Sequence, residues 1–561
     1  MRWVREPGLL MTLVYAVVAY VLCKAVSAVL NGFATRIGEQ AAEEGLDHTP
    51  ALAEWIVKAS VRLLPAEHRG RYLQEFLAEL DWKREKLGEN APLSLLAEAV
   101  LLAGGALRMA VSLRWEAIWF PGPLPTLWVG PIGNGMLFLL VIGHVLGGGV
   151  YTLISEVAAR AGGAMWAAFL GALALALVTA SSLTELSTKY PTAGGVGLYA
   201  LKAFKRPSME FMAMYVLATA NIAVLAVNAR VVSGRYLAEI VNRPLPVGLV
   251  APVLVLILGL VSFRRVTKST KAIFVGSVLI EVSGLLLIIG IGVVALLHGV
   301  GTPSSAPHTT PVTEAGNPLF GVLGGATLAF YALIGFENFV GFADETKDPA
   351  KGLPRALLGG ALFAGVIYVL VSLVAGTVVG AGRLGQSDRG LLEVVEVAGM
   401  PIPPRVFSAI ALVAVTNTAW LSFIIASRLL YRMTRKGIIP SLFGGMHAER
   451  HTRLIVIGFV SMIAIALTLT GGVSTLGDTA VLLLLVVFAA MHVAVLKLRA
   501  DPVAHGHFRV PSVVPIVGLA LCIVLLFTQL HPETLVRAAL LLLLGVGLWL
   551  ANLMTSRRRP E

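Results

Sequence analysis

The stretch Leu137–Gly162 reads LFLLVIGHVLGGGVYTLISEVAARAG, and it decides the fold class. It is apolar and long enough to cross a bilayer, for which a helix needs about 20 residues. Gly147, Gly148 and Gly149 fall consecutively near its middle. Each glycine costs a helix roughly 1 kcal/mol relative to alanine, so this run predicts an unwound break. Because unpaired backbone is expensive in a bilayer, we expect such a break to line a polar cavity.

The composition of the chain is that of a helical membrane protein. It has 561 residues, of which 57% are hydrophobic and only 14% charged. Repeated apolar runs of about 20 residues predict a polytopic all-α protein whose surroundings are the lipid bilayer. The formal charge of +12 resides mainly in short loops between these runs. It therefore indicates membrane topology and not nucleic-acid binding.

The sequence carries no signature of an enzyme. Its two cysteines, Cys23 and Cys522, lie in apolar runs far apart, which argues against a disulfide framework or a metal cluster. Neither a nucleotide-binding loop nor a hydrolytic triad is recognisable, so an ATP-driven pump and a membrane hydrolase are disfavoured. We expect no cofactor and no bound metal.

The residues before the glycine-containing span form an extension. A basic start is followed by the apolar run 9–33, whose length favours a retained anchor over a signal peptide. Apolar residues at helical spacing in 63–86 predict an amphipathic helix. The segment 92–113 would bury two charged side chains if it spanned the bilayer, which favours an interfacial helix. The predicted divisions are an N-terminal transmembrane anchor at 1–33, a polar and amphipathic extension at 34–130, a twelve-helix core at 131–554 and a basic tail at 555–561.

Twelve apolar runs make up the core, and the charges between them set its orientation. Cations gather in alternate loops, as in Lys202 to Arg206, Arg264 to Lys271 and Arg432 to Arg453. The other loops carry few cations, so the positive-inside rule places both ends of the core in the cytoplasm. The predicted spans are 134–160, 164–188, 208–238, 246–263, 272–298, 318–343, 355–381, 405–433, 455–471, 475–497, 512–530 and 534–554.

A second polar interruption lies five spans after the first. The segment Leu328–Thr346 reads LAFYALIGFENFVGFADET, with Gly335 at mid-span and Glu337 and Asn338 close behind it. A lone glycine usually serves helix packing, but a break at this position matches an inverted repeat of five helices. Because five is odd, the second half starts from the opposite side of the membrane. The sequence therefore predicts a 5+5 inverted repeat with two facing broken helices, followed by two further helices.

Four segments of the core resemble the amino acid–polyamine–organocation superfamily of transporters, in particular the branch with cationic amino acid transporters and their bacterial relatives. The resemblance runs from about residue 133 to 554, in the expected order, and leaves the first 130 residues uncovered. The segments are VIGHVLGGGVYTL (141–153), SSLTELSTKYPTAGGVGLY (181–199), FYALIGFENFVGFADETKDPAKGLPRAL (330–357) and SRLLYRMTRKGIIP (427–440).

This resemblance implies a solute site built largely from backbone. The N–H groups of Gly147, Gly148 and Gly149 would hold a substrate carboxylate, and a half-helix N-terminus does favour anions. Carbonyl groups around Ala332–Gly335 would hold the α-amino group. An amino-acid zwitterion fits both breaks.

Two carboxylates and two aromatic side chains belong to the same expected site. Glu337 at the second break could carry a coupling proton or bind a cationic side chain, or it could be a structural carboxylate bonded to neighbouring N–H groups. Some proton-coupled relatives have a lysine about where Glu281 lies, so a lysine-based mechanism is in doubt here. Glu281 is then either a proton relay or part of a buried pair. Tyr151 and Phe336 are candidate pocket walls, although aromatic side chains in a bundle more often fill the core.

Four further polar residues are candidates for ion coupling or gating. Thr416 and Asn417 occupy the span where sodium-coupled members of this fold place a cation site, but hydroxyls in membrane helices usually bond to backbone. Histidine is the side chain that ordinarily titrates near neutral pH, so His144 is expected to be either a gating or proton-carrying residue or a packed polar side chain. Glu185, near a cytoplasmic helix end, is expected to contact loop cations at an inner gate.

These observations favour a secondary transporter of the plasma membrane that moves an amino acid by alternating access, with a coupling proton or, less readily, sodium. One alternative is a carrier of polyamines or other organocations, or an exchanger without a coupling ion. An alternative of another class is a nutrient sensor that acts through the N-terminal extension. Oligomeric state and the particular amino acid are not encoded in any recognisable pattern.

Overall fold

The chain divides into two compact units, Met1–Gly122 and Pro123–Glu561. The predicted anchor at 1–33, nearly all of the segment 92–113 and most of the basic tail lie outside the described residues. The computed structural model describes residues 132–192, 194–262, 268–299, 318–399, 403–439, 449–529 and 531–556, with short pieces between residues 53 and 99.

The first unit contains part of the predicted amphipathic helix. Residues 73, 74 and 76–81 are helical. Within this stretch Leu80 is buried in a small cluster with Ala53, Val57 and Ala99. The apolar residues of the predicted helix are therefore covered, at least in part, by the unit's own side chains.

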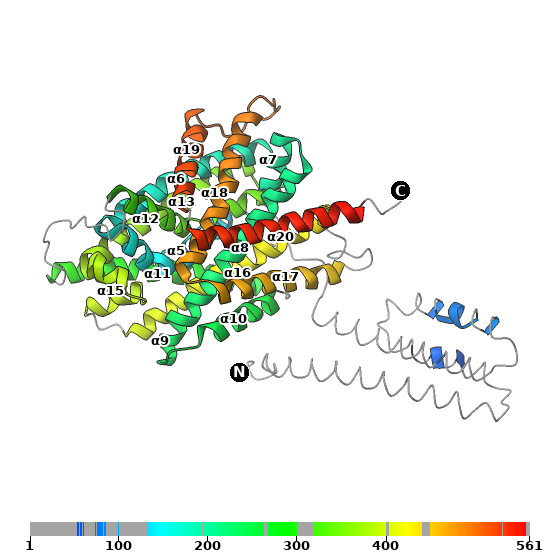
Figure 1. Cartoon of the computed structure of the whole chain (residues 1–561), viewed down its shortest axis with the longest axis horizontal. Coiled ribbons are helices and arrows are strands. Elements are labelled where there is room, and N and C mark those ends of the chain that lie inside the picture. The colour runs from blue at the N-terminus through cyan, green and yellow to red at the C-terminus, as the bar shows by residue number, and fades with distance from the viewer. Residues whose placement is uncertain are drawn as a thin grey trace. The chain divides into compact units, whose positions relative to one another are not determined.

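The second unit is helical throughout its described residues, apart from turns, connecting loops and an isolated bridge between Ile132 and Thr346 (Figure 1). Two short elements, η3 and η5, are π-helices, whereas η2 and η4 are 3₁₀-helices. The elements are α5 (Asn134–Ala161), η2 (Gly162–Ala164), α6 (Met165–Lys189), α7 (Gly195–Phe204), α8 (Pro207–Val231), η3 (Val232–Tyr236), α9 (Leu237–Val241), α10 (Val247–Ser262), α11 (Lys268–Leu297), α12 (Pro318–Ala332), η4 (Phe336–Glu345), α13 (Pro349–Ala375), η5 (Gly376–Gly380), α14 (Ala381–Gln386), α15 (Leu391–Val397), α16 (Pro404–Arg435), α17 (Glu449–Thr470), α18 (Val473–Leu498), α19 (Val513–Phe527) and α20 (Pro532–Ser556).

The helices have the length and polarity that membrane crossing requires. Within the described residues, 7 helical segments are long and apolar enough to span, or 8 if the bent pair α12 and η4 is one span. Each predicted span overlaps a helix, including the shorter apolar helices α10, α17 and α19. Large apolar side chains such as Leu249, Leu297 and Phe527 are exposed, as lipid-facing positions would be. The prediction of an all-α polytopic membrane protein is confirmed.

Helix α5 does not unwind at its three glycines, so the prediction of a break there is wrong. It runs without interruption through all 28 residues. A Cβ atom at Gly147 would lie 2.3 Å from the Thr418 hydroxyl oxygen, and one at Gly149 would lie 2.5 Å from the Ala332 carbonyl oxygen. The glycines therefore serve close approach of α12 and α16 to α5. The dispersion attraction between such closely packed helices can offset the helix penalty of glycine.

The second predicted break is confirmed. Helix α12 ends at Ala332, and η4 starts at Phe336 after a bend of 44°. Between them Gly335 has φ 137°, a conformation that residues with a Cβ rarely adopt. A Cβ there would also lie 2.4 Å from Cδ2 of His144. The bend thus requires glycine for backbone geometry and for contact with α5.

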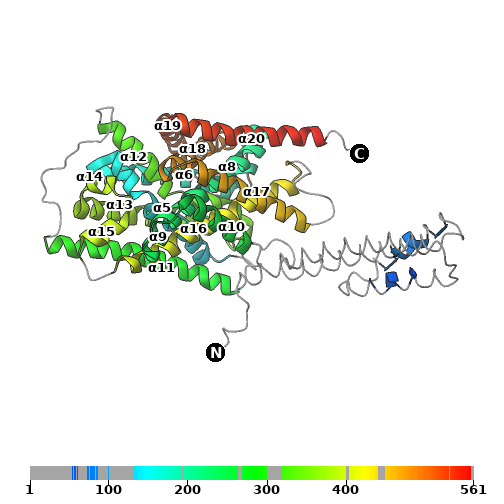
Figure 2. The ribbon, with the colours of Figure 1, turned by 60° about the horizontal axis from the view of Figure 1, so that its bottom comes forward.

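Helix α5 lies inside the bundle, in contact with α12, α13 and α16 (Figures 1 and 2). Most of its residues are buried. Near its C-terminal end, Nη2 of Arg160 donates to Oδ2 of Asp478 in α18 at 2.6 Å. The polar groups considered below are therefore held around a well-packed central helix.

Replacing Gly149 by alanine tests the close approach. Its new Cβ would lie 2.5 Å from both the Ala332 carbonyl oxygen and the Tyr368 hydroxyl, so adjacent helices would have to shift. We expect Gly149→Ala to lower the free energy of unfolding by about 1–3 kcal/mol, the usual range for overpacking. Thermal unfolding in detergent measures the effect.

The control for this prediction is Gly135→Ala in the same helix. Nothing lies within 4 Å of a Cβ built at Gly135, so only the favourable helix propensity of alanine should act there. Gly135→Ala is expected to be neutral or slightly stabilising. Equal losses of stability in the two variants would contradict the packing role of Gly149.

Candidate functional site

A buried carboxylate lies beside the glycine face of α5. Glu281 of α11 is fully buried, and its Oε1 accepts a hydrogen bond of 2.9 Å from the Asn417 amide of α16. A Cβ built at Gly147 would lie 2.5 Å from Oε1 of Glu281 and 2.3 Å from the Thr418 hydroxyl oxygen. We call Gly147, Glu281, Asn417 and Thr418 the carboxylate cluster. Three helices thus converge on one glycine.

The carboxylate cluster contains hydrogen-bonding capacity that the protein does not use. Among the described residues, Oε2 of Glu281 and the hydroxyl of Thr418 have no hydrogen-bond partner. A buried polar group without a partner costs about 1–3 kcal/mol, and a bare charge costs more. The cluster is therefore suited to take up a proton or a small polar ligand.

Asn228 of α8 extends this polar region along α5. Its Oδ1 accepts a hydrogen bond of 3.1 Å from the Thr152 hydroxyl, whereas its Nδ2 has no partner among the described residues. A Cβ at Gly148 would lie 3.0 Å from either terminal atom of Asn228. The amide therefore offers a donor next to the carboxylate cluster.

A second group of polar side chains stabilises the bend after α12. Oε2 of Glu337 accepts a hydrogen bond of 2.8 Å from the Gly335 N–H, and its Oε1 accepts one of 2.9 Å from the Asn338 amide. The Asn338 amide also lies 3.4 Å from Nε2 of His144 and exchanges hydrogen bonds with Asn221 of α8. We call these five residues the break cluster. Glu337 thus makes the contacts of a structural carboxylate, the alternative left open by the sequence.

The two predicted aromatic walls have defined contacts. The Tyr151 hydroxyl donates to the Glu281 backbone carbonyl at 2.9 Å, and its ring lies 6.0 Å from that of Phe407. The ring of Phe336 stacks on Phe488 at 6.2 Å. Both side chains are fully buried. Tyr151 thereby fixes α11, which carries Glu281, against α5.

Two predicted coupling residues lie elsewhere or lack the expected contacts. Glu185 of α6 forms an ion pair of 2.8 Å with Arg499, just after α18, and its Oε2 also accepts the Val510 N–H at 3.0 Å. It fastens the segment between α18 and α19 and belongs to neither cluster. Thr416 precedes Asn417 on α16, and its hydroxyl has no partner among the described residues. Asn417 bonds to Glu281, not to a hydroxyl set around a cation.

Sequence reasoning missed three polar residues, of which Asn228 and Tyr368 contact α5 and Asn221 contacts η4. Asn221 and Asn228 are seven residues apart, which places them two turns apart on the same face of α8. That spacing within an otherwise apolar run was the available signal. Tyr368 of α13 donates to the Val145 carbonyl at 2.6 Å, and a single tyrosine in a long apolar run gives no comparable pattern.

The geometry of the described residues allows binding chemistry. In the described part of the chain, no group of three His, Cys, Asp or Glu side chains could hold a metal ion. The free capacity comprises an acid oxygen, a hydroxyl and an amide donor from three helices. Because the Cβ positions of Gly147, Gly148 and Gly149 are blocked, a solute could enter only if α5 moved relative to its neighbours.

Relatives of this chain carry different small molecules, according to their names. The branched-chain amino acid permease BcaP of Bacillus subtilis is 27% identical over 432 residues, covering 74% of this chain and 92% of the relative. Cationic amino acid transporter 9, chloroplastic, of Arabidopsis thaliana is 27% identical over 334 residues, covering 55% of this chain and 56% of the relative. The low-affinity putrescine importer PlaP of Escherichia coli is 25% identical over 408 residues, covering 70% and 86%.

The sequence profile for the amino acid permease family matches residues 136–549. That range is most of the chain and contains both polar clusters. It begins within α5 and ends within α20, so it covers the whole helical bundle and leaves out the first unit. The chain belongs to the amino acid permease family, within the amino acid–polyamine–organocation superfamily of transporters.

Proposed function

We propose that this permease moves an amino acid across the plasma membrane by alternating access, and that Glu281 carries the coupling proton. The observation that supports the proposal is the carboxylate cluster, in which Glu281 has a free oxygen and a single side-chain donor, Asn417. A charge at the centre of a membrane helix costs about 2.5–3.5 kcal/mol. The buried cluster therefore favours a protonated carboxyl or one paired with an ammonium group.

The free polar atoms also suggest how a zwitterion binds. Because α5 is an intact helix, most N–H groups at its glycines are engaged within it. The substrate carboxylate would instead accept hydrogen bonds from Asn228 and Thr418, whose side chains have unused capacity. Its ammonium group would meet the Ala332 carbonyl, which lies close to Gly149. Donors for the carboxylate and an acceptor for the ammonium group thus adjoin the consecutive residues Gly148 and Gly149.

The orientation of the bundle follows the same proposal. By the positive-inside rule, both ends of residues 131–554 would lie in the cytoplasm. In a 5+5 repeat the bend after α12 would have the intact helix α5 as its counterpart in the first half. The residues before 131 would then be an addition to the transporting core.

Uptake into proteoliposomes tests the function directly. Labelled branched-chain and cationic amino acids and putrescine would be offered with and without an acidic exterior. We expect amino-acid accumulation that rises several-fold with the inward proton gradient and is abolished by a proton ionophore. Uptake of putrescine alone would favour the organocation carrier, an alternative that an unpaired Glu281 oxygen also suits. Uptake that ignores the gradient would contradict proton coupling.

Substituting Glu281 separates coupling from binding. Glu281→Gln keeps the shape and the contact with Asn417 but cannot release a proton. We expect exchange of internal for external amino acid to persist, whereas accumulation driven by the pH gradient falls at least tenfold. Glu533→Gln, at an exposed acid in α20 with a side chain 71% accessible, is the control and should match the parent. Full gradient-driven accumulation by Glu281→Gln would assign the proton to another group.

A further inference from the structure

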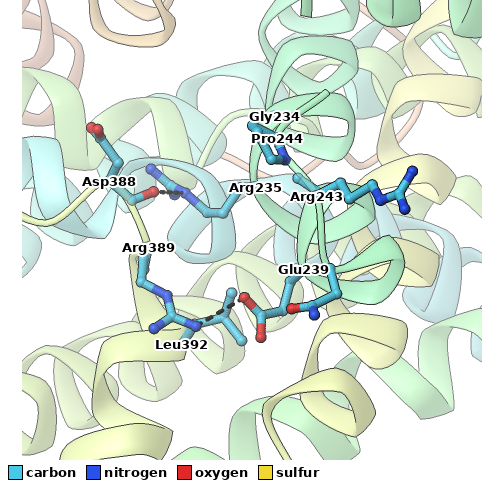
Figure 3. A pocket seen from close by; sticks show the side chains of 10 residues that line it. Gly234, Arg235, Glu239, Arg243, Pro244, Asp388, Arg389 and Leu392 are labelled. Carbon is cyan, nitrogen blue, oxygen red and sulfur yellow. Dashed lines mark hydrogen bonds and ion pairs between the residues drawn. The ribbon is translucent and has the colours of Figure 1, made fainter. Parts of the chain in front are cut away.

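A cavity of about 360 Å³ lies beyond the end of α8 (Figure 3), and none of its lining residues belongs to the carboxylate cluster or the break cluster. It is lined by η3, α9 and the loop after α14, and its charged lining residues are Arg235, Glu239, Arg243, Asp388 and Arg389. The loop charges predict that this end of the bundle faces the cell exterior. The cavity is therefore placed where a solute would first meet the protein.

Arg235 is half-buried, with a side chain 8% accessible, and it joins three separate segments. Its Nη1 donates to the backbone carbonyls of Tyr151 and Thr152 in α5, at 3.3 and 3.0 Å. Its Nε donates to the Asp388 carbonyl at 2.5 Å, as the dashed line in Figure 3 shows. Its Nη2 lies 3.5 Å from a carboxylate oxygen of Glu156, also in α5. One guanidinium thus ties the outer half of α5 to η3 and to the loop after α14.

Local structure is specialised to admit this guanidinium. Arg235 lies in the π-helix η3, an irregularity that changes the direction of side chains and often occurs at functional sites. Gly390 has φ 60°, and a Cβ built there would lie 2.8 Å from Nη1 of Arg235. Both the π-helical backbone of η3 and the absence of a side chain at Gly390 therefore favour the observed position of Arg235.

Arg389 provides a comparison within the same cavity. It forms ion pairs with Glu239 at 2.9 Å and with Glu396 at 2.5 Å. Those partners lie in α9 and α15, so these ion pairs do not involve α5. Arg389 links α9 to α15. Arg235, by contrast, contacts the central helix α5.

We propose that Arg235 is a latch that keeps the outer end of α5 closed. The proposal rests on the alternating access proposed above, since it assigns the contact that must break when the outer side opens. Opening moves α5 away from η3, which removes both carbonyl acceptors and the Glu156 carboxylate from Arg235. The adjoining cavity gives the released side chain space and access to water, which lowers the cost of separating the charges.

Thiol labelling in the absence of substrate tests the latch. Ser155, one turn beyond Tyr151, is buried, and its hydroxyl has no partner among the described residues. Ser155→Cys, in a chain with Cys23→Ser and Cys522→Ala, is the reporter for a membrane-impermeant maleimide applied to intact cells. Adding Arg235→Gln should raise the labelling rate at least tenfold. Arg389→Gln is the matched control and should leave the rate within twofold of the parent.

A second variant displaces the guanidinium without removing its charge. Gly390→Ala places a methyl group against Nη1 of Arg235, so it should also accelerate labelling. The labelling rate with Arg235→Lys should also exceed that of the parent, because one ammonium group cannot bond to acceptors in three directions. Unchanged labelling with Arg235→Gln, or equal acceleration with Arg389→Gln, would overturn the latch.

The labelling result and the transport result are independent. Labelling reports the outer conformation and requires no substrate. If labelling rises as expected but no amino acid is transported, the latch stands and the proposed function fails. If amino acids are transported but labelling does not change, the proposed function stands and the latch fails.

Discussion

Close contact between helices at the glycines of α5 is the constraint on which the buried site depends. Without a Cβ at Gly147, the Glu281 carboxylate and the Thr418 hydroxyl can approach the helix backbone. Without one at Gly149, the Ala332 carbonyl can do the same from the other side. In a bilayer, where no hydrophobic force draws helices together, such small-residue contacts are a principal source of association. Stability and the arrangement of polar groups therefore have one cause.

The bend after α12 shows how the protein meets the cost of broken backbone. Ending a helix at mid-bundle leaves N–H and carbonyl groups without helical partners. Glu337 accepts the Gly335 N–H, and Asn338 connects that carboxylate to Asn221. The polar residues that make the segment conspicuous in the sequence thus satisfy its own backbone and fasten it to α8. Glu281, by contrast, keeps one oxygen unused among the described residues, which is why the two acids are assigned different roles.

The sequence predicts the helices and the second break well because both have local causes. Hydrophobic run length fixes the spans, and Gly335 next to Glu337 and Asn338 marks an interruption that its own neighbours satisfy. The glycine run at 147–149 misleads because helix propensity is local, whereas the groups that fill the space at those glycines come from α8, α11, α12, α13 and α16, far along the chain. The contacts of Arg235 could not be predicted from the sequence for the same reason. Its carbonyl acceptors lie more than 80 residues earlier in α5, and carbonyls leave no trace in sequence.

The contacts of α5 are arranged along its length in a way that couples them. His144 packs on the bend at Gly335, the glycine face packs on the carboxylate cluster, and the carbonyls of Tyr151 and Thr152 bind Arg235. These contacts lie on one continuous helix with buried sides. A rigid helix transmits displacement along its axis, so a shift large enough to free its outer carbonyls also loosens the packing at Gly147. Under the proposed function, opening to solvent and exposure of the Glu281 carboxyl would then be one movement, which is the physical requirement for a proton to be taken up only when the outer side is open.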